Sequence, residues 1–436
     1  MDNQRNLLLA VALSGLLILG WDLAMRHLYP QDSLTERVTE VTVNGSPTST
    51  NTSVSGMDMS VERVLQPIDL ATALSSPNRI TIDAPRLKGS INLVGARVDG
   101  IDLKDHRLTL DEQSGPVKLF APEGTSEQYF AQFGWVGSGV SLPNANTIWD
   151  SSDDILTPES PITLTHENDQ GQEFRIVLSV DDNYMIKAEQ TLINNATGPI
   201  VVRPYGFINR SSVGADPSQF IVHAGPMGGF GDTVEYGPDY DELLENGVHT
   251  PDGGRPDWLG FSDIYWLSAL IPGKALEASA AFRPVGEDIF RADLIYDPIT
   301  IPAAGNFTTT SHLFAGAKES GLLDQYRDEL NINNFGKAVD WGWFEWFVKP
   351  MVWLLRTLYD FVGNFGVAII LLTVLIRGLL FPIAQKQFAS MAAMKAVQPK
   401  MKAIQERHKD DKQKQQQEIM KLYKDEGVNP LAGCLP

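Results

Sequence analysis

One basic residue lies inside a long apolar segment, where its charge could serve chemistry at a membrane. The segment runs from Phe361 to Ile383, and Arg377 is its only ionisable side chain. As a helix rising 1.5 Å per residue, these 23 residues would span about 34 Å, which is enough to cross a bilayer. A charge at bilayer depth costs roughly 2.5–3.5 kcal/mol, so it normally faces protein or water. Arg377 is therefore predicted either to line a wet site or to snorkel to nearby headgroups.

Four histidines offer a rival chemistry, in which a membrane-tethered domain would process carbohydrate. His106, His166, His223 and His312, with scattered carboxylates, could carry acid–base steps if the fold brought them together. A single histidine among strands is more often a surface or core residue. The sequence has no phosphate-binding glycine loop, no metal-ligand spacing and no Ser/His/Asp arrangement beside them. It therefore predicts no cofactor, no metal and no covalent catalysis.

The net charge of −19 is unevenly distributed over the 436 residues. Residues 27–340 hold 20 Lys+Arg against 44 Asp+Glu, a net charge of −24, and the two ends together carry +5. Phosphate repulsion argues against nucleic-acid binding by this acidic middle region. Cys434 is the only cysteine, so an intramolecular disulfide is excluded and the redox compartment stays open.

The N-terminal residues 1–26 predict a membrane anchor. Apolar and small residues run from Leu7 to Trp21 after Arg5, and Trp21 suits an interfacial position. A cleaved signal peptide is the alternative, but no small-x-small cleavage site follows. Ten Lys or Arg lie in residues 385–424. The positive-inside rule therefore predicts that this C-terminal part and the N-terminus are cytoplasmic. Residues 27–340 would then lie on the other side of the membrane, which is the periplasm in a bacterium.

The middle region predicts a large antiparallel β-sandwich. Apolar residues alternate over residues 173–180 and return over Met185–Ile193 after an Asp-Asp-Asn turn, as half-buried strands require. Further strands are expected at Arg79–Asp83, Val98–Leu103 and Ile200–Tyr205. Ser320–Leu330 instead has one apolar helical face, formed by Leu322, Leu323, Tyr326 and Leu330.

Aromatic and charged helices are expected on either side of the apolar segment. Four tryptophans suit a helix at headgroup level, with a buried core helix as the alternative: Trp341, Trp343, Trp346 and Trp353. Beyond Pro382, helix-forming residues run to Gln398, are interrupted at Pro399 and continue to His408; a second helix is expected at Gln413–Lys424. These predict an antiparallel hairpin, or else a solvated charged coil.

Residues 339–436 strongly resemble the YidC membrane-protein insertase family. The resemblance rests on three segments, VDWGWFEWFVKP (Val339–Pro350), FVGNFGVAIILLTVLIRGLLFPIAQKQFASMAAMKAVQPK (Phe361–Lys400) and DDKQKQQQEIMKLYKDEGVNPLAGCLP (Asp410–Pro436). The start, MDNQRNLLL, and the large insert resemble the Gram-negative branch of that family.

The resemblance implies an insertase and folding chaperone for inner-membrane proteins, working alone or beside the Sec translocon. It implies a hydrophilic groove that contains Arg377 and Thr373, which share one helical face. The hairpin would receive substrate through Gln385, Lys386, Met391, Met394 and Met401. Its implied partners are nascent membrane proteins, the Sec translocon, lipids and, at the cytoplasmic face, the ribosome. The middle region would be a β-supersandwich resembling sugar-mutarotase folds.

The expected architecture is a multidomain membrane protein. Its predicted parts are an anchor (1–26), a flexible linker (27–60), a periplasmic β-supersandwich with a C-terminal helix (61–335), an interfacial helix (336–356), a transmembrane helix (357–384), a cytoplasmic hairpin (385–427) and the start of a further membrane region (428–436). Since the family continues beyond NPLAGCLP, the sequence is expected to be truncated. A scaffold in which Arg377 only snorkels remains the alternative function.

Overall fold

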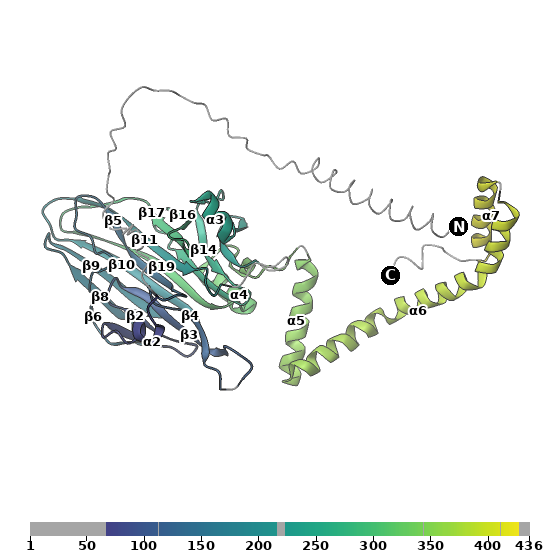
Figure 1. The fold of residues 1–436 in the computed structure, drawn as a ribbon, viewed down its shortest axis with the longest axis horizontal. Coiled ribbons are helices and arrows are strands. Elements are labelled where there is room, and N and C mark those ends of the chain that lie inside the picture. Colours follow the sequence, from purple (N-terminus) through teal and green to yellow (C-terminus); the bar gives the residue numbers. More distant parts are fainter. Residues whose placement is uncertain (1–66, 112, 216–222, 343, 410, 427–436) are drawn as a thin grey trace, which may run out of the picture. The chain divides into compact units, whose positions relative to one another are not determined.

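Two large β-sheets and a set of helices make up the part of the chain that the structure describes. The computed structural model describes residues 67–111, 113–215, 223–342, 344–409 and 411–426. The sheets lie between Arg79 and Ala317, and helices α5, α6 and α7 come last in the chain (Figure 1). The expected anchor (1–26), linker (27–60) and segment 428–436, together with Trp343, lie outside the described residues.

The sheets contain ten and nine strands. The larger sheet has, in spatial order, β16 (Ala278–Pro284), β17 (Ile289–Tyr296), β11 (Ile200–Ser211), β5 (Tyr129–Gly137), β3 (Arg97–Arg107), β2 (Leu87–Asn92), β1 (Arg79–Asp83) and β7 (Ile155–Leu156), with β18 (Ile299–Ile301) beside β11 and β4 (Pro116–Phe120) beside β3. The smaller sheet has β13 (Thr233–Tyr236), β12 (Gly225–Phe230), β14 (Pro256–Ser262), β15 (Trp266–Pro272), β19 (Gly305–Ala317), β10 (Met185–Asn194), β9 (Gln172–Val180), β8 (Ile162–Glu167) and β6 (Asp150–Ser151).

The strand pairing is antiparallel, as the sequence predicts, with one exception among the described pairs. β1 pairs in parallel with β7 through Thr81 and Ile82. The five strands expected from the sequence all occur, as β1, β9, β10, β3 and β11. Alternation in β9 is complete: every second side chain from Gln172 to Val180 is buried. The large all-β domain is therefore confirmed.

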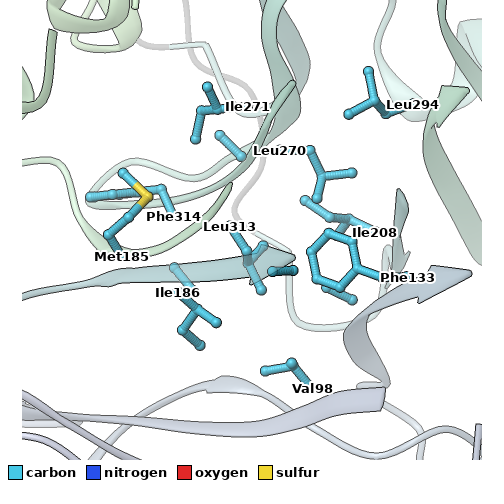
Figure 2. Close-up of a cluster of buried hydrophobic side chains, with 14 of the residues drawn as sticks. Val98, Phe133, Met185, Ile186, Ile208, Leu270, Ile271, Leu294, Leu313 and Phe314 are labelled. Carbon is cyan, nitrogen blue, oxygen red and sulfur yellow. The ribbon is translucent and has the colours of Figure 1, made fainter. Parts of the chain in front are cut away.

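The larger of two buried apolar clusters in the described part of the chain fills the space between the sheets. Figure 2 shows Phe133 and Ile208 of the ten-stranded sheet facing Leu270 and Leu313 of the nine-stranded sheet. A polar contact crosses the same space, because the Gln190 amide donates to the carbonyl oxygen of Gly134 at 2.7 Å. Burial of such side chains stabilises the sandwich by roughly 1.5–3 kcal/mol each.

The ring of Tyr184, just before β10, packs against the end of β19. Its ring lies so close to Gly316 that a Cβ on that glycine would be 2.2 Å from the ring carbon Cγ. The Arg86 guanidinium carbon lies 4.3 Å from the centre of the same ring, in a cation–π contact. Any larger residue at position 316 would displace the ring and the contacts that depend on it.

Short helices cover the sandwich. α2 (Leu70–Leu74) and α3 (Tyr240–Asn246) are each capped by an aspartate at the N-cap position. α4 (Ser320–Leu330) has the limits that the sequence predicts, and it buries Leu322, Leu323 and Tyr326. The 3₁₀ helix η1 (Phe335–Ala338) buries Phe335 in the same core, so the chain belongs to the sandwich as far as Ala338.

The helix limits expected around Phe361 are wrong. α5 covers Glu345–Val362 and α6 covers Phe365–Arg407, so the predicted interfacial (336–356) and transmembrane (357–384) limits do not match the helices. Gly363 adopts a left-handed conformation with φ 68° and ends α5. The Asn364 side chain then accepts from the Val367 N–H at 3.1 Å and caps α6. The apolar run is thus shared between two helices.

The expected interruption at Pro399 is also wrong. α6 continues through both Pro382 and Pro399 as one helix of 43 residues, and α7 (Lys412–Asp425) follows it. Each proline removes one backbone hydrogen bond, at a cost of about 3 kcal/mol or more in a helix interior. Flanking helix formers such as Met394 and Lys395 offset that cost. Proline therefore marks a weak point in α6 rather than its end.

Gly316→Ala is expected to destabilise the protein by roughly 1–3 kcal/mol, because the methyl group overlaps the Tyr184 ring. Urea unfolding followed by tryptophan fluorescence measures the loss. Gly198→Ala is the matched control, since no atom lies within 4 Å of the added Cβ there. Equal unfolding midpoints for the two variants would contradict this account of the Tyr184 contact.

Candidate functional site

α6 supplies a segment that can cross a membrane. Among the described residues, it is the one helix long and apolar enough to span a bilayer. Its apolar part runs from Phe365 to Ile383, about 28 Å at 1.5 Å per residue. Leucine, isoleucine and phenylalanine side chains are exposed all around this part rather than packed in a protein core. An apolar helix with such exposed sides needs a membrane or further protein around it.

Arg377 is exposed on this helix. No described residue forms an ion pair or hydrogen bond with its guanidinium. The side chain carries five N–H donors and stays charged at any physiological pH. In an α-helix the Cα–Cβ bond is tilted toward the N-terminus. The first bonds of the Arg377 side chain therefore point toward Phe365, away from the nearer C-terminal end of the span.

Thr373 lies one turn before Arg377, on the same side of α6. Its hydroxyl donates to the carbonyl oxygen of Ile369 at 2.8 Å, which keeps the polar hydrogen satisfied in apolar surroundings. The hydroxyl oxygen can still accept a hydrogen bond. Thr373 and Arg377 thus form one polar strip on the apolar part of α6, residues 365–383.

The end of α6 and α7 form an antiparallel hairpin. Lys400 pairs with Glu426 at 2.6 Å, and the Gln415 amide donates to the Gln405 carbonyl at 3.1 Å. His408 lies 3.1 Å from Glu418 near the connection between the helices. The end of α6 contacts the start of α7, and Lys400, farther back in α6, contacts Glu426 just after the end of α7. The solvated-coil alternative is therefore excluded by the packing.

The five residues expected to receive substrate have different surroundings. Gln385, Lys386 and Met391 are exposed on α6, and Met394 is half-buried. Met401 instead packs inside the hairpin, where the Tyr423 hydroxyl lies 3.1 Å from its sulfur atom. Exposed methionine offers a flexible apolar surface that adapts to different partners. Met401 contributes to the hairpin's own stability.

The aromatic helix is not a core helix. α5 buries none of its side chains, and Trp346 and Trp353 are 74% and 67% exposed. Trp341 precedes the helix and is half-buried, with the Lys349 ammonium 5.8 Å from the centre of its ring. Exposed indoles beside a spanning helix fit a position at the membrane surface, where the ring meets lipid and its N–H meets water.

The four histidines are not brought together. His166 packs on Trp149 and Phe174, whereas His223 meets Tyr236. His312 is on β19, and His106 lies beside Glu319 at 3.8 Å. Among the described residues, no group of His, Cys, Asp and Glu could hold a metal ion. The arrangement gives no support to the carbohydrate-processing alternative.

Sequence reasoning missed a polar cluster at the end of the sandwich. Arg86 pairs with Asp105 at 2.6 Å and with Glu319, and the Tyr184 hydroxyl lies 3.3 Å from His106. These residues come from four separated segments, so no local motif indicates the cluster. The contacts with Glu319 join the β1–β2 turn to the residue that precedes α4.

The β-sandwich and the apolar α6 define a membrane protein with a large all-β domain. Two sequence families match the chain: the YidC periplasmic domain over residues 79–354 and the 60Kd inner membrane protein over residues 357–436. A membrane protein insertase YidC from Zymomonas mobilis is 40% identical over 437 residues, covering 99% of this chain and 73% of the relative. The chain belongs to the YidC family of membrane protein insertases.

Two solved structures are similar over parts of the chain. The crystal structure of an active YidC insertase shares 17% identity, covers 85% of this chain and 70% of its own, and gives a TM-score of 0.30. A galactose mutarotase-like protein from Lactobacillus casei shares 11% identity over 54% of this chain and 99% of its own, with a TM-score of 0.37. Scores this low carry no argument for a common fold.

Family membership establishes the general role. The protein is an insertase of the inner membrane that acts on other membrane proteins, and it is not an enzyme that makes or breaks covalent bonds. The resemblance read from the sequence is thereby confirmed.

The His312→Gln variant is expected to lose less unfolding free energy than the wild type as the pH falls from 6.5 towards 4. Burial, reinforced by Lys187, lowers the pKa of His312 to about 4 from 6.5, while Glu189 acts in the opposite direction. Between these values the unfolded chain binds a proton that the folded chain does not, so stability falls as the pH falls from 6.5 towards 4. The loss attributable to His312 is at most roughly 3 kcal/mol.

Urea unfolding of both proteins across this pH window measures the effect. Other buried acids affect both proteins equally, so the informative quantity is the difference between the two profiles. If wild type and His312→Gln lose stability in parallel, His312 is not neutral in the folded protein.

Proposed function

We propose that Arg377 works inside a hydrated groove that draws polar parts of a client protein into the membrane. The carrying observation is a charged, exposed guanidinium without a described partner on an apolar helix. Arg377 lies six residues before Ile383, about 9 Å along the axis. Because its side chain sets out toward the middle of the span, headgroups at the C-terminal end are the less accessible partner. A wet groove supplies the missing partners.

Electrostatics then accounts for insertion. A guanidinium in a water-filled cavity with low-dielectric walls attracts the acidic and polar residues that flank a client's apolar segment. Those residues enter part of the bilayer in water, so the apolar barrier that they must cross is shorter. The client's apolar segment moves along the lipid-facing side and is released by hydrophobic partition. Thr373, one turn away, offers a second hydrogen-bonding group to the passing backbone.

The rest of the chain supports this role from both sides of the membrane. In this proposal residues 27–340 are periplasmic, the N-terminus is cytoplasmic after the 1–26 anchor, and α5 rests at the surface through Trp341, Trp343, Trp346 and Trp353. The hairpin is cytoplasmic and receives client segments from the ribosome through exposed side chains, including Gln385, Lys386 and Met391. The sandwich is available to the Sec translocon as a docking domain.

Arg377→Lys is expected to retain most insertion activity, and Arg377→Ala is expected to lose at least about tenfold. Lysine keeps the positive charge that attracts clients, whereas alanine removes both the charge and the reason for water to enter. The measurement is the protease-protected yield of a single-span client with an acidic flank, inserted into proteoliposomes that contain the protein.

A neutral-flank client is the matched control, because its insertion depends less on the arginine. Equal activity of wild type, Arg377→Lys and Arg377→Ala would overturn the electrostatic proposal and favour the scaffold alternative. Loss in both variants would indicate that guanidinium geometry, rather than charge, is required.

A photo-crosslinking residue at position 373 is expected to capture a nascent client during insertion. The matched control is position 375, which points about 200° away around the helix and should capture lipid instead. Crosslinked products are separated by mass and identified with a tagged client. A client crosslink at position 375 equal to that at 373 would show that clients have no preferred side of α6.

A further inference from the structure

Three large apolar side chains are exposed at one end of the sandwich. Leu108 and Leu110 belong to the connection between β3 and β4, which extends beyond the sheets in Figure 1, and they are 59% and 105% exposed. Tyr265, in the turn between β14 and β15, is 67% exposed. Apolar side chains that gather on a polar surface mark a place of interaction.

The two segments are joined by ring contacts. The ring of His106, two residues before Leu108, meets Trp266 edge-on with the centroids 5.1 Å apart. Tyr265 meets the same indole at 6.2 Å. Both segments therefore meet at Trp266, which places their exposed apolar side chains at the same end of the sandwich surface. This surface, formed by Leu108, Leu110 and Tyr265, is named the apolar rim.

The rim is at the end of the sandwich from which the chain leaves for α5. In the nine-stranded sheet, Gly225 pairs with Ser262 and Trp266 pairs with Ala317, so these strand ends share one edge. Tyr236 ends β13 at the same edge, where its ring is 5.6 Å from His223. The Tyr236 hydroxyl donates to the carbonyl oxygen of Lys337 at 3.2 Å.

The chain between this edge and α5 is short. Lys337 and Glu345 are eight residues apart, so they can be separated by at most about 28 Å. If α5 lies at the membrane surface, the exit edge of the sandwich must stay within that distance of the surface. We propose that the side chains of the apolar rim insert into the periplasmic leaflet and keep the sandwich in contact with the bilayer surface. The proposal depends on the interfacial position of α5 proposed above.

The rim's chemistry fits the acyl region better than charged headgroups. Leucine contributes apolar area, and tyrosine favours the boundary between lipid and water. Arg107, Asp111 and Glu112 flank the two leucines in the chain, so the rim has no excess of positive charge to bind anionic headgroups. Residues 27–340 carry a net charge of −24, which would repel anionic lipid. Contact therefore depends on apolar insertion and should persist on uncharged lipid and at high salt.

The test places an environment-sensitive fluorophore at Leu110. Leu110→Cys is made in a Cys434→Ser background, labelled, and reconstituted in phosphatidylcholine vesicles with and without bromine-labelled acyl chains. The expected result is blue-shifted emission and several-fold more quenching by the brominated lipid than for Asp169→Cys. Asp169 is exposed in the β8–β9 turn, at the opposite end of β9 from the exit edge.

Trp353→Cys, labelled in the same way, separates this inference from the proposed function on which it rests. Quenching at positions 353 and 110 supports both. Quenching at 353 without quenching at 110 overturns the apolar rim alone, and quenching at neither overturns the interfacial α5 as well. A blue shift at 110 that brominated lipid does not quench indicates a protein partner and also overturns the inference.

Discussion

The permanent positive charge of Arg377 on an apolar helical segment is the main physical constraint on this protein, because the charge must be solvated or paired. The Arg377 guanidinium cannot release its proton to escape an apolar environment, because its pKa is far above physiological pH. It must therefore be supplied with water, a counter-charge or headgroups. In the function proposed here water fills this role, because the Arg377 side chain points at first toward the middle of the span.

Two kinds of stability coexist in the chain. The sandwich is held mainly by the large core between its sheets, in which aromatic side chains are fully buried and Tyr184 fits against a glycine. α5, α6 and α7 bury few side chains of their own. The sandwich therefore buries its own apolar side chains, whereas the apolar side chains of α5 and α6 are left largely exposed.

Local patterns predicted those elements whose sequence signals agree with their surroundings. β9 has strict alternation and α4 has one apolar face, so each was located within a residue or two. The boundary between α5 and α6 was missed, because apolar residues continue across Gly363 and Asn364 and hide the change of direction. The interruption predicted at Pro399 was wrong, because a long helix tolerates one lost hydrogen bond when the neighbouring residues favour helix.

The sequence by itself determined the all-β middle domain, the spanning segment with its single charge, and the family, because alternation, apolar length and long runs of matching residues are local properties. The tertiary structure alone decided that the four histidines lie apart, that Met401 packs between the helices of the hairpin, and that His106 and Tyr265 both contact Trp266. Those facts depend on which distant strands pair and in which register, and no short segment of sequence encodes that choice.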